Sequence, residues 1–233
     1  MSYKYPVYQP SLRQKEKDNV LECLDSTWIS SKGKFITQFE NSFSDFIGIK
    51  HSVAVCNGTV AIHAALLSLG IGDGDEVIVP SFTYIASVNA IKYTGAKAVF
   101  VDSDLHTWQI DPAKIEGKIT NRTKAIMPVH LYGQPCEMDI ILSIAKKHNL
   151  FIVEDCAEAF GSLYKGKHVG TFGDISTFSF FGNKTITTGE GGMVVTNDSS
   201  LHEKVVHLKG QGLAKDREYY HDIVGYNYRM TNI

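Results

Sequence analysis

The sequence lacks the patterns that usually form disulfides, bind metals or cross membranes. Its four cysteines are far apart and show no CxxC pattern: Cys23, Cys56, Cys136 and Cys156. Such spacing predicts free thiols in a reducing cytoplasm. The nine histidines contain no HExxH pair, so we expect no metal site. No apolar run approaches the length of a membrane span, and the opening residues lack the apolar region of a signal peptide, so we expect a cytoplasmic protein without a membrane partner.

A strong charge of either sign is also absent. The chain has 23 Lys and Arg residues against 25 Asp and Glu residues, and its longest basic run is Lys146-Lys147. Nonspecific nucleic-acid binding needs a basic face, so we expect no nucleic-acid partner. The composition is 43% apolar and 21% charged, which is typical of a globular protein. A length of 233 residues suits one large α/β domain or two small ones.

Short β-branched runs alternate with longer helical ones along the chain. Strands are predicted at "HSVAVC", "DEVIVP", "KAVFVD", "TKAIMPVH", "LFIVED", "DISTFSF" and "GGMVVTN". Helices are predicted between or after them at Thr59–Leu69, Thr83–Tyr93, Met138–Lys147 and Ser199–Leu208. This alternation predicts βαβ units, and the continuous apolar strands predict a mostly parallel central sheet with helices on both faces.

The two ends of the chain depart from this alternation. Near the N-terminus, Ser11–Leu24 and Phe35–Phe46 read as amphipathic helices joined by the turn-rich "TWISSKGKF". The last residues, "VGYNYRMTNI", show neither a helix stop signal nor a charged tail. We therefore expect the chain to stop within a longer protein.

Candidate site residues follow several of the predicted strands, because ligands bind at the carboxyl ends of parallel strands. Gly58 and Thr59 open a helix after "AVC", where backbone N–H groups suit an anion. Asp155 ends the apolar "LFIV" strand, and Tyr84 follows "VIVP". Each has an ordinary alternative: Thr59 as a helix cap, Asp155 as a cap or structural ion pair, and Tyr84 as a core aromatic.

A single lysine, Lys184, stands in the stretch "STFSFFGNKTITTGEGG". A nucleotide P-loop needs the spacing G-x-x-x-x-G-K-[ST]. Here Asn183 separates Gly182 from Lys184, and the position five before Gly182 is Thr177, so the P-loop is excluded. A solvated surface lysine and a reactive amine both remain open for Lys184 on this evidence alone.

These positions together predict one chemistry better than any of them does alone. They combine an anion cradle, a buried carboxylate, an aromatic face and an amine: Gly58, Thr59, Ser179, Asp155, Tyr84 and Lys184. Such a set suits a flat phosphorylated pyridine aldehyde, in which the amine binds the aldehyde and the carboxylate keeps the ring nitrogen protonated. The predicted cofactor is pyridoxal 5'-phosphate (PLP).

Seven segments carry a resemblance to a known family: "WISSKGKFITQFE", "CNGTVAIHAAL", "GDEVIVPSFTYIASVNAI", "VHLYGQP", "VEDCAEAFGS", "STFSFFGNKTITTGEGGMVVTN" and "GYNYRMTNI". The sequence resembles the PLP-dependent aminotransferases of the DegT/DnrJ/EryC1/StrS family, which make amino sugars from nucleotide-linked keto sugars. The resemblance implies an aspartate-aminotransferase-like (fold type I) large domain over residues 1–233. That domain includes an N-terminal helical segment at about residues 1–50, and the family's C-terminal small domain is missing.

The resemblance also implies roles for the cofactor site. Lys184 is the lysine that binds PLP covalently, and Asp155 is the partner of its ring nitrogen. Glu158 stands beside the ring hydroxyl, where the family often has Gln or His, and Tyr84 stacks on the ring. The phosphate ligands are Gly58, Thr59 and Ser179.

Other implied roles concern the substrate and a second subunit. Asn227 reaches the phosphate of the other subunit in a homodimer with shared active sites, and Trp28, Ser30 and His130 line the substrate side. The branch of the family implied here aminates GDP-4-keto-6-deoxymannose for O-antigen polysaccharide, with L-glutamate as donor and 2-oxoglutarate as by-product.

Three alternatives remain beside this reading. A UDP- or dTDP-linked keto sugar could be the acceptor, and a truncated chain could be a non-catalytic remnant. A PLP-dependent sugar dehydratase is the third, but that branch replaces the lysine by histidine, and the presence of Lys184 favours aminotransfer.

Overall fold

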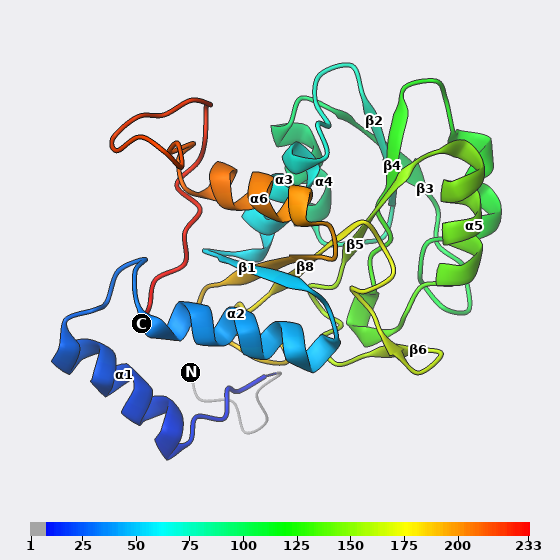
Figure 1. The fold of residues 1–233 in the computed structure, drawn as a ribbon. Helices are drawn as coiled ribbons and strands as arrows, with labels where there is room; N and C mark the ends of the chain where they lie inside the picture. The colour runs from blue at the N-terminus through cyan, green and yellow to red at the C-terminus, as the bar shows by residue number, and fades with distance from the viewer. Residues whose placement is uncertain (1–7) are drawn as a thin grey trace.

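The computed structural model describes residues 8–233 and is built around a seven-stranded sheet (Figure 1). Its strand order is β1-β9-β8-β5-β4-β2-β3. The strands are β1 (His51–Val55), β2 (Glu76–Pro80), β3 (Lys97–Val101), β4 (Thr123–Ile126), β5 (Phe151–Asp155), β8 (Ile175–Ser179) and β9 (Gly192–Thr196). All seven predicted runs form strands, since each supplies β-branched side chains to a buried sheet.

Most of the sheet is parallel, as predicted. Strands β2, β3, β4, β5 and β8 run parallel to one another, while β9 lies antiparallel between β1 and β8. The parallel strands end at one edge of the sheet, so the loops that follow them meet there.

Helices cover both faces of the sheet, and two apolar clusters fill the layers between. Helices α3 (Gly58–Ser68), α4 (Ile85–Tyr93) and α6 (Ser199–Lys209) pack on one face, and α2 (Lys34–Ile47) and α5 (Met138–His148) pack on the other (Figure 1). Side chains of β1 alternate between the clusters, with Val53 and Val55 in one and Ala54 in the other. This three-layer arrangement confirms the predicted fold class.

Several element boundaries differ from the sequence prediction. Helix α4 begins at Ile85 and not at Thr83, because Tyr84 has an extended backbone at the N-cap. Helix α1 (Gln14–Ser26) begins after Ser11, at a cap where the Arg13 N–H donates to the Glu16 carboxylate. Cys23 is the one residue of α1 that is buried.

The shortest elements were not predicted, because two or three residues show no hydrophobic periodicity. The hairpin of β6 (Leu163–Tyr164) and β7 (Lys167–His168) turns at Lys165 and Gly166, which both have positive φ. The 3-10 helices are η1 (Pro112–Lys114), η2 (Glu116–Lys118) and η3 (Leu131–Gly133). Among the described residues, no helix is both long enough and apolar enough to cross a bilayer.

Asn232 joins the two ends of the described chain. Its backbone N–H donates to the Ser30 carbonyl at 2.7 Å, and its side-chain amide donates to the Trp28 carbonyl at 2.7 Å. Its Oδ1 accepts from the Phe35 N–H at 3.0 Å. The segment between α1 and α2 is thereby held against the last residues, and a Cβ at Gly33 would lie only 2.2 Å from the Asn232 side chain.

Strand β9 begins at Gly192, close to the backbone at the start of α3. A Cβ at Gly192 would lie 2.5 Å from the carbonyl oxygen of Asn57, which is rigid backbone. Gly192→Ala should therefore lower the unfolding free energy by about 1–3 kcal/mol, because β9 or α3 must shift. Urea denaturation measures this change, and Gly117→Ala is the matched control because its Cβ would meet nothing within 4 Å. Equal stability of the two variants would contradict the prediction.

Candidate active site

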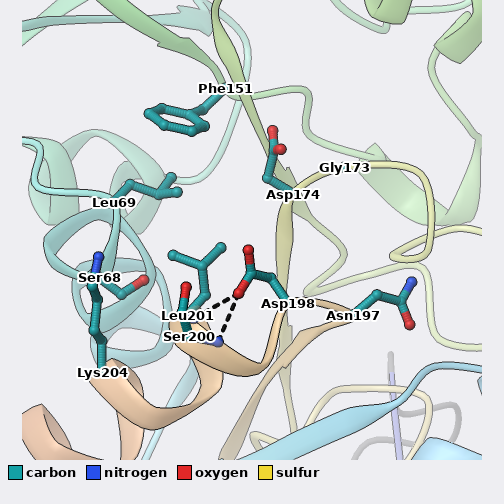
Figure 2. A pocket seen from close by; sticks show the side chains of 10 residues that line it. All are labelled: Ser68, Leu69, Phe151, Gly173, Asp174, Asn197, Asp198, Ser200, Leu201 and Lys204. Atoms are coloured by element: carbon teal, nitrogen blue, oxygen red, sulfur yellow. Dashed lines mark hydrogen bonds between the residues drawn. The ribbon is translucent and has the colours of Figure 1, made fainter.

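A cavity of about 580 Å³ opens at the carboxyl ends of the strands. Seven of the predicted site residues line it: Gly58, Thr59, Tyr84, Asp155, Glu158, Ser179 and Lys184. They follow or end β1, β2, β5 and β8, so the topology brings them together from distant parts of the chain. A second pocket, of about 440 Å³, lies at the opposite end of the strands beside Phe151, Asp174 and Asn197 (Figure 2). None of the predicted site residues lines that second pocket.

The start of α3 forms an anion cradle. Asn57 caps the helix by accepting the Val60 N–H at 3.0 Å, which leaves the N–H groups of Gly58 and Thr59 at the open helix end. A Cβ at Gly58 would lie 2.7 Å from the Ser179 Cβ. Glycine is therefore required for Ser179 to approach the helix end, and the three predicted phosphate ligands lie together.

Asp155 ends β5 with its carboxylate buried beneath the cavity. Its exposed fraction is 3%. The Ala157 N–H donates to Oδ1 at 3.1 Å, and the Ser87 hydroxyl donates to Oδ2 at 2.7 Å. Burial raises the pKa of the Asp155 carboxyl, while these donors and the charge of Lys184 oppose the rise. The site thus holds a carboxylate that favours a nearby cation.

Lys184 is enclosed in the cavity wall, which excludes the surface-lysine alternative. Its side chain is 17% exposed and its Nζ lies 3.4 Å from Glu158 Oε1. The other oxygen of Glu158 accepts the Tyr132 N–H at 2.9 Å. Glu158 is thereby fixed from the η3 side and holds the Lys184 amine by an ion pair.

The loop after Lys184 returns tightly to β9. The Phe180 carbonyl accepts from the Thr188 N–H at 3.0 Å and from the Thr187 hydroxyl at 2.9 Å. Gly189 has a φ of +83°, a conformation that side chains disfavour. These contacts fix the loop that carries Lys184.

Tyr84 lies at the mouth of the cavity and is 72% exposed. Its position at the N-cap of α4 presents the ring to the cavity, so it is not the core aromatic of the alternative reading. Its stacking on a ligand ring stays a prediction.

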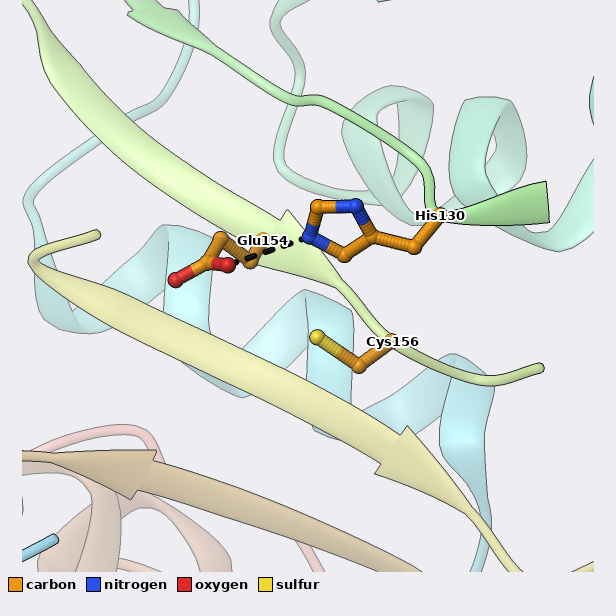
Figure 3. Close-up of side chains that lie close together, drawn as sticks. All are labelled: His130, Glu154 and Cys156. Atoms are coloured by element: carbon orange, nitrogen blue, oxygen red, sulfur yellow. Dashed lines mark hydrogen bonds and ion pairs between the residues drawn. The ribbon is translucent and has the colours of Figure 1, made fainter. Parts of the chain in front are cut away.

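The prediction that His130 lines the substrate side is wrong. The side chain is fully buried, and the cavity is lined by its neighbours Val129 and Leu131. Its Nε2 lies 3.0 Å from Glu154 Oε2, and its Nδ1 accepts the Cys136 N–H at 3.1 Å. Because Nδ1 accepts, the ring proton is on Nε2, and this N–H donates a hydrogen bond to Glu154 (Figure 3). The ring therefore has no exposed atom that contacts a substrate.

The carboxylate of Glu154 binds several donors besides His130. They are the N–H groups of Gly170, Phe172 and Gly173, at 2.7 to 2.8 Å, and the hydroxyl of Ser176 at 3.2 Å. These hydrogen bonds outweigh burial and lower the pKa of the Glu154 carboxyl. His130, Glu154 and Cys156 have ligand-type atoms within 4.8 Å of one another, but the carboxylate is already saturated with donors (Figure 3). The cluster fits a structural role.

The remaining predicted residues lie away from this cavity. Trp28 and Ser30 bind Asn232 through their backbone carbonyls, and neither lines the cavity. Asn227 is exposed, and its Oδ1 accepts from Arg229 at 3.3 Å. Its exposure leaves the predicted contact with another subunit as a prediction.

Sequence reasoning missed some residues that line the cavity. Ser87 is the foremost, and Asn183, Phe181 and Glu190 are others. A signal for Ser87 was available, because the helix predicted at Thr83–Tyr93 puts Ser87 four residues after Thr83 and so on the same face.

The donor set fits a phosphorylated aldehyde bound through a lysine, which is the class of site found in PLP-dependent transaminases. The amino-acid sequence matches a known protein family. Residues 10–233 match the model of the DegT/DnrJ/EryC1/StrS aminotransferase family, and the chain belongs to that family.

Several named proteins and solved structures are similar to this chain in sequence or fold. It is 70% identical over 228 residues to a GDP-perosamine synthase of Escherichia coli O157:H7, covering 98% of this chain and 63% of that protein. It is similar to the crystal structure of an aminotransferase from Psychrobacter cryohalolentis, with 42% identity and a TM-score of 0.92 over 97% of this chain and 60% of that one. A putative sugar aminotransferase from Streptococcus pneumoniae in its PLP form gives 31% identity and a TM-score of 0.93, over 99% and 64%. The chain thus spans less than two thirds of the length of these proteins.

Removing one partner of the buried Glu154 cluster should destabilise the protein strongly. In Glu154→Gln the new amide NH₂ faces N–H donors and leaves them without an acceptor. The His130 ring cannot become the acceptor by moving its proton to Nδ1, because Nδ1 already accepts the Cys136 N–H. We expect a loss of about 1–3 kcal/mol in unfolding free energy by urea denaturation, because buried N–H donors lose their acceptor. Glu116→Gln is the control, because Glu116 is exposed and its ion pairs contribute little. Equal losses in the two variants would show that the cluster has no special role.

The Asp155 carboxylate should reduce the stability of the cofactor-free protein at neutral pH. Because burial raises its pKa above 3.8, ionisation lowers stability as pH rises through the folded-state pKa. Asp155→Asn should therefore raise stability by about 1 kcal/mol, or roughly 2–4 °C in Tm, at pH 8, and by less at pH 4. Thermal unfolding checks this.

Asp104→Asn is the control for that measurement. The N–H groups of Thr107 and His106 lower the pKa of the Asp104 carboxyl, so its removal should not raise Tm. A lower Tm of Asp155→Asn at pH 8 would contradict the assigned burial cost.

Proposed function

We propose that the protein is a PLP-dependent aminotransferase that converts GDP-4-keto-6-deoxy-D-mannose and L-glutamate to GDP-perosamine and 2-oxoglutarate, for O-antigen polysaccharide. The observation that carries this proposal is the meeting of Lys184, Asp155 and the α3 anion cradle in one cavity. Family membership supports the cofactor and the reaction, and the identity to a GDP-perosamine synthase supports the substrate.

The residues present fit PLP. The helix end at Gly58 and Thr59 would hold the phosphate together with Ser179, which the glycine admits at short range. Asp155 would receive the protonated ring nitrogen, a cation that its buried carboxylate favours. When bound, PLP supplies an aldehyde that takes up the amino group and a ring that withdraws electrons from the reacting carbon.

The chain's own side chains would then bind, orient and move protons. Lys184 would bind the aldehyde, and its amine, once released, would take the proton from Cα of glutamate. The same amine would later deliver a proton to C4 of the sugar. Glu158 keeps Lys184 on the cavity wall through the ion pair at 3.4 Å, and Asp155 would keep the ring nitrogen protonated.

The proposal extends to assembly and location. The outward-facing Asn227 supports a homodimer in which each subunit completes the other's phosphate site. The four free thiols support a reducing cytoplasm.

Lys184→Ala tests the proposed function directly. Removing the amine should lower turnover at least about 1,000-fold, because one group performs both proton transfers. Product formation from GDP-4-keto-6-deoxymannose and glutamate is followed by mass spectrometry. In the wild type, borohydride should attach the mass of the reduced cofactor to the peptide containing Lys184, and in the variant it should not.

Lys124→Ala serves as the control, since Lys124 lies on β4 outside the cavity. Normal turnover in Lys184→Ala would refute the assignment of the lysine. Release of ammonia with a deoxy sugar would identify a dehydratase, and a wild type that stays colourless with PLP would identify a non-catalytic chain.

A further inference from the structure

A chain of hydroxyl groups leads from the cavity mouth to the buried carboxylate of Asp155. The Thr83 hydroxyl lies 3.1 Å from the Ser87 hydroxyl, and Ser87 Oγ lies 2.7 Å from Asp155 Oδ2. Ser87 is 1% exposed, so water does not compete for this contact. Thr83 precedes the N-cap of α4, Ser87 lies in its first turn, and both line the cavity.

The direction of these hydrogen bonds follows from the proton count. An ionised carboxylate only accepts, so the single proton of the Ser87 hydroxyl goes to Asp155. The Ser87 oxygen then accepts, and the proton in the other bond comes from Thr83. Two hydroxyls in series, each polarised by the next, stabilise a charge more than one isolated donor.

Both oxygens of the Asp155 carboxylate are thereby held from different elements. The Ala157 N–H binds Oδ1 from the loop after β5, and Ser87 binds Oδ2 from α4. The carboxyl plane is fixed by two contacts, and its remaining lone pairs are left for a group in the cavity. The other ionisable groups nearby are Lys184 in the β8–β9 loop, Glu158, His130 and Cys156.

We propose that Ser87 is a positioning residue that, supported by Thr83, keeps the Asp155 carboxylate ionised and aimed at the protonated nitrogen of a heterocyclic cofactor. This inference rests on the proposed function. A carboxylate that receives a hydrogen bond from Ser87 is a weaker base, so the proton shared with the ring nitrogen stays on that nitrogen. Without Ser87 the proton moves toward Asp155, and the ring withdraws electrons less effectively.

Ser87→Ala tests this, with Ser68→Ala as the matched control. Ser68 is equally buried and donates its hydroxyl to the Ala65 carbonyl at 2.7 Å, away from the site. In the cofactor-free protein, Ser87→Ala should lower Tm more at pH 8 than at pH 4, because burial raises the pKa of the Asp155 carboxyl above 3.8 and the ionised carboxylate depends most on its donor. Ser68→Ala should lower Tm equally at both values, and in an Asp155→Asn background the pH dependence of Ser87→Ala should disappear.

With PLP and substrates, Ser87→Ala should lower kcat roughly tenfold and leave the KM for glutamate within about twofold. Ser87→Thr keeps the hydroxyl and should restore kcat. If the added methyl group disturbs folding, Thr83→Val provides the second test, since it removes the upstream donor and should lower kcat by a smaller factor.

Two results would overturn the proposal: a pH-independent Tm loss in Ser87→Ala equal to that of Ser68→Ala, or a wild-type kcat in Ser87→Ala. Absence of turnover in the wild type would instead refute the proposed function, and it would not alter the Tm comparison in the cofactor-free protein. The two failures are therefore distinguishable.

Discussion

The carboxylate of Asp155 is buried at the end of β5, and the rest of the site is arranged around the cost of burying it. An unpaired carboxylate in such a place is expensive, and hydrogen bonds from Ser87 and Ala157 offset part of that cost. The remaining attraction for a cation is what the proposed function assigns to a protonated ring nitrogen. Because the compensating groups come from α4 and from the loop after β5, the site exists only when β5 lies in the sheet between β4 and β8 and α4 packs against it.

Neighbouring residues on β5 perform opposite tasks because strand side chains alternate between faces. Asp155 serves the cavity, while Glu154 is saturated by His130 and by the loop at Gly170 to Gly173. The backbone N–H of His130 donates to the Asp155 carbonyl at 3.0 Å. By binding His130, Glu154 therefore helps to fix the backbone of β5 at Asp155.

Local pattern was sufficient to predict the seven strands and the main helices. Each strand is a run of apolar, β-branched residues, and the rule that ligands bind at carboxyl ends placed Gly58, Asp155 and Lys184 near one another. The hairpin at Leu163–His168 was missed because two-residue strands carry no period. The role of His130 was wrong because burial by Glu154, 24 residues away, has no local signature.

By itself, the sequence determined the three-layer α/β fold, the family and seven of the residues that line the cavity, because these depend on periodicity and on motifs within short segments. Only the tertiary structure decided which polar groups pair in the interior. Ser87 holding Asp155, Glu158 holding Lys184 and His130 closing on Glu154 each join elements that are distant in the chain. Hydrogen bonds depend on distance and direction in space, and only the packed sheet and its helices supply these.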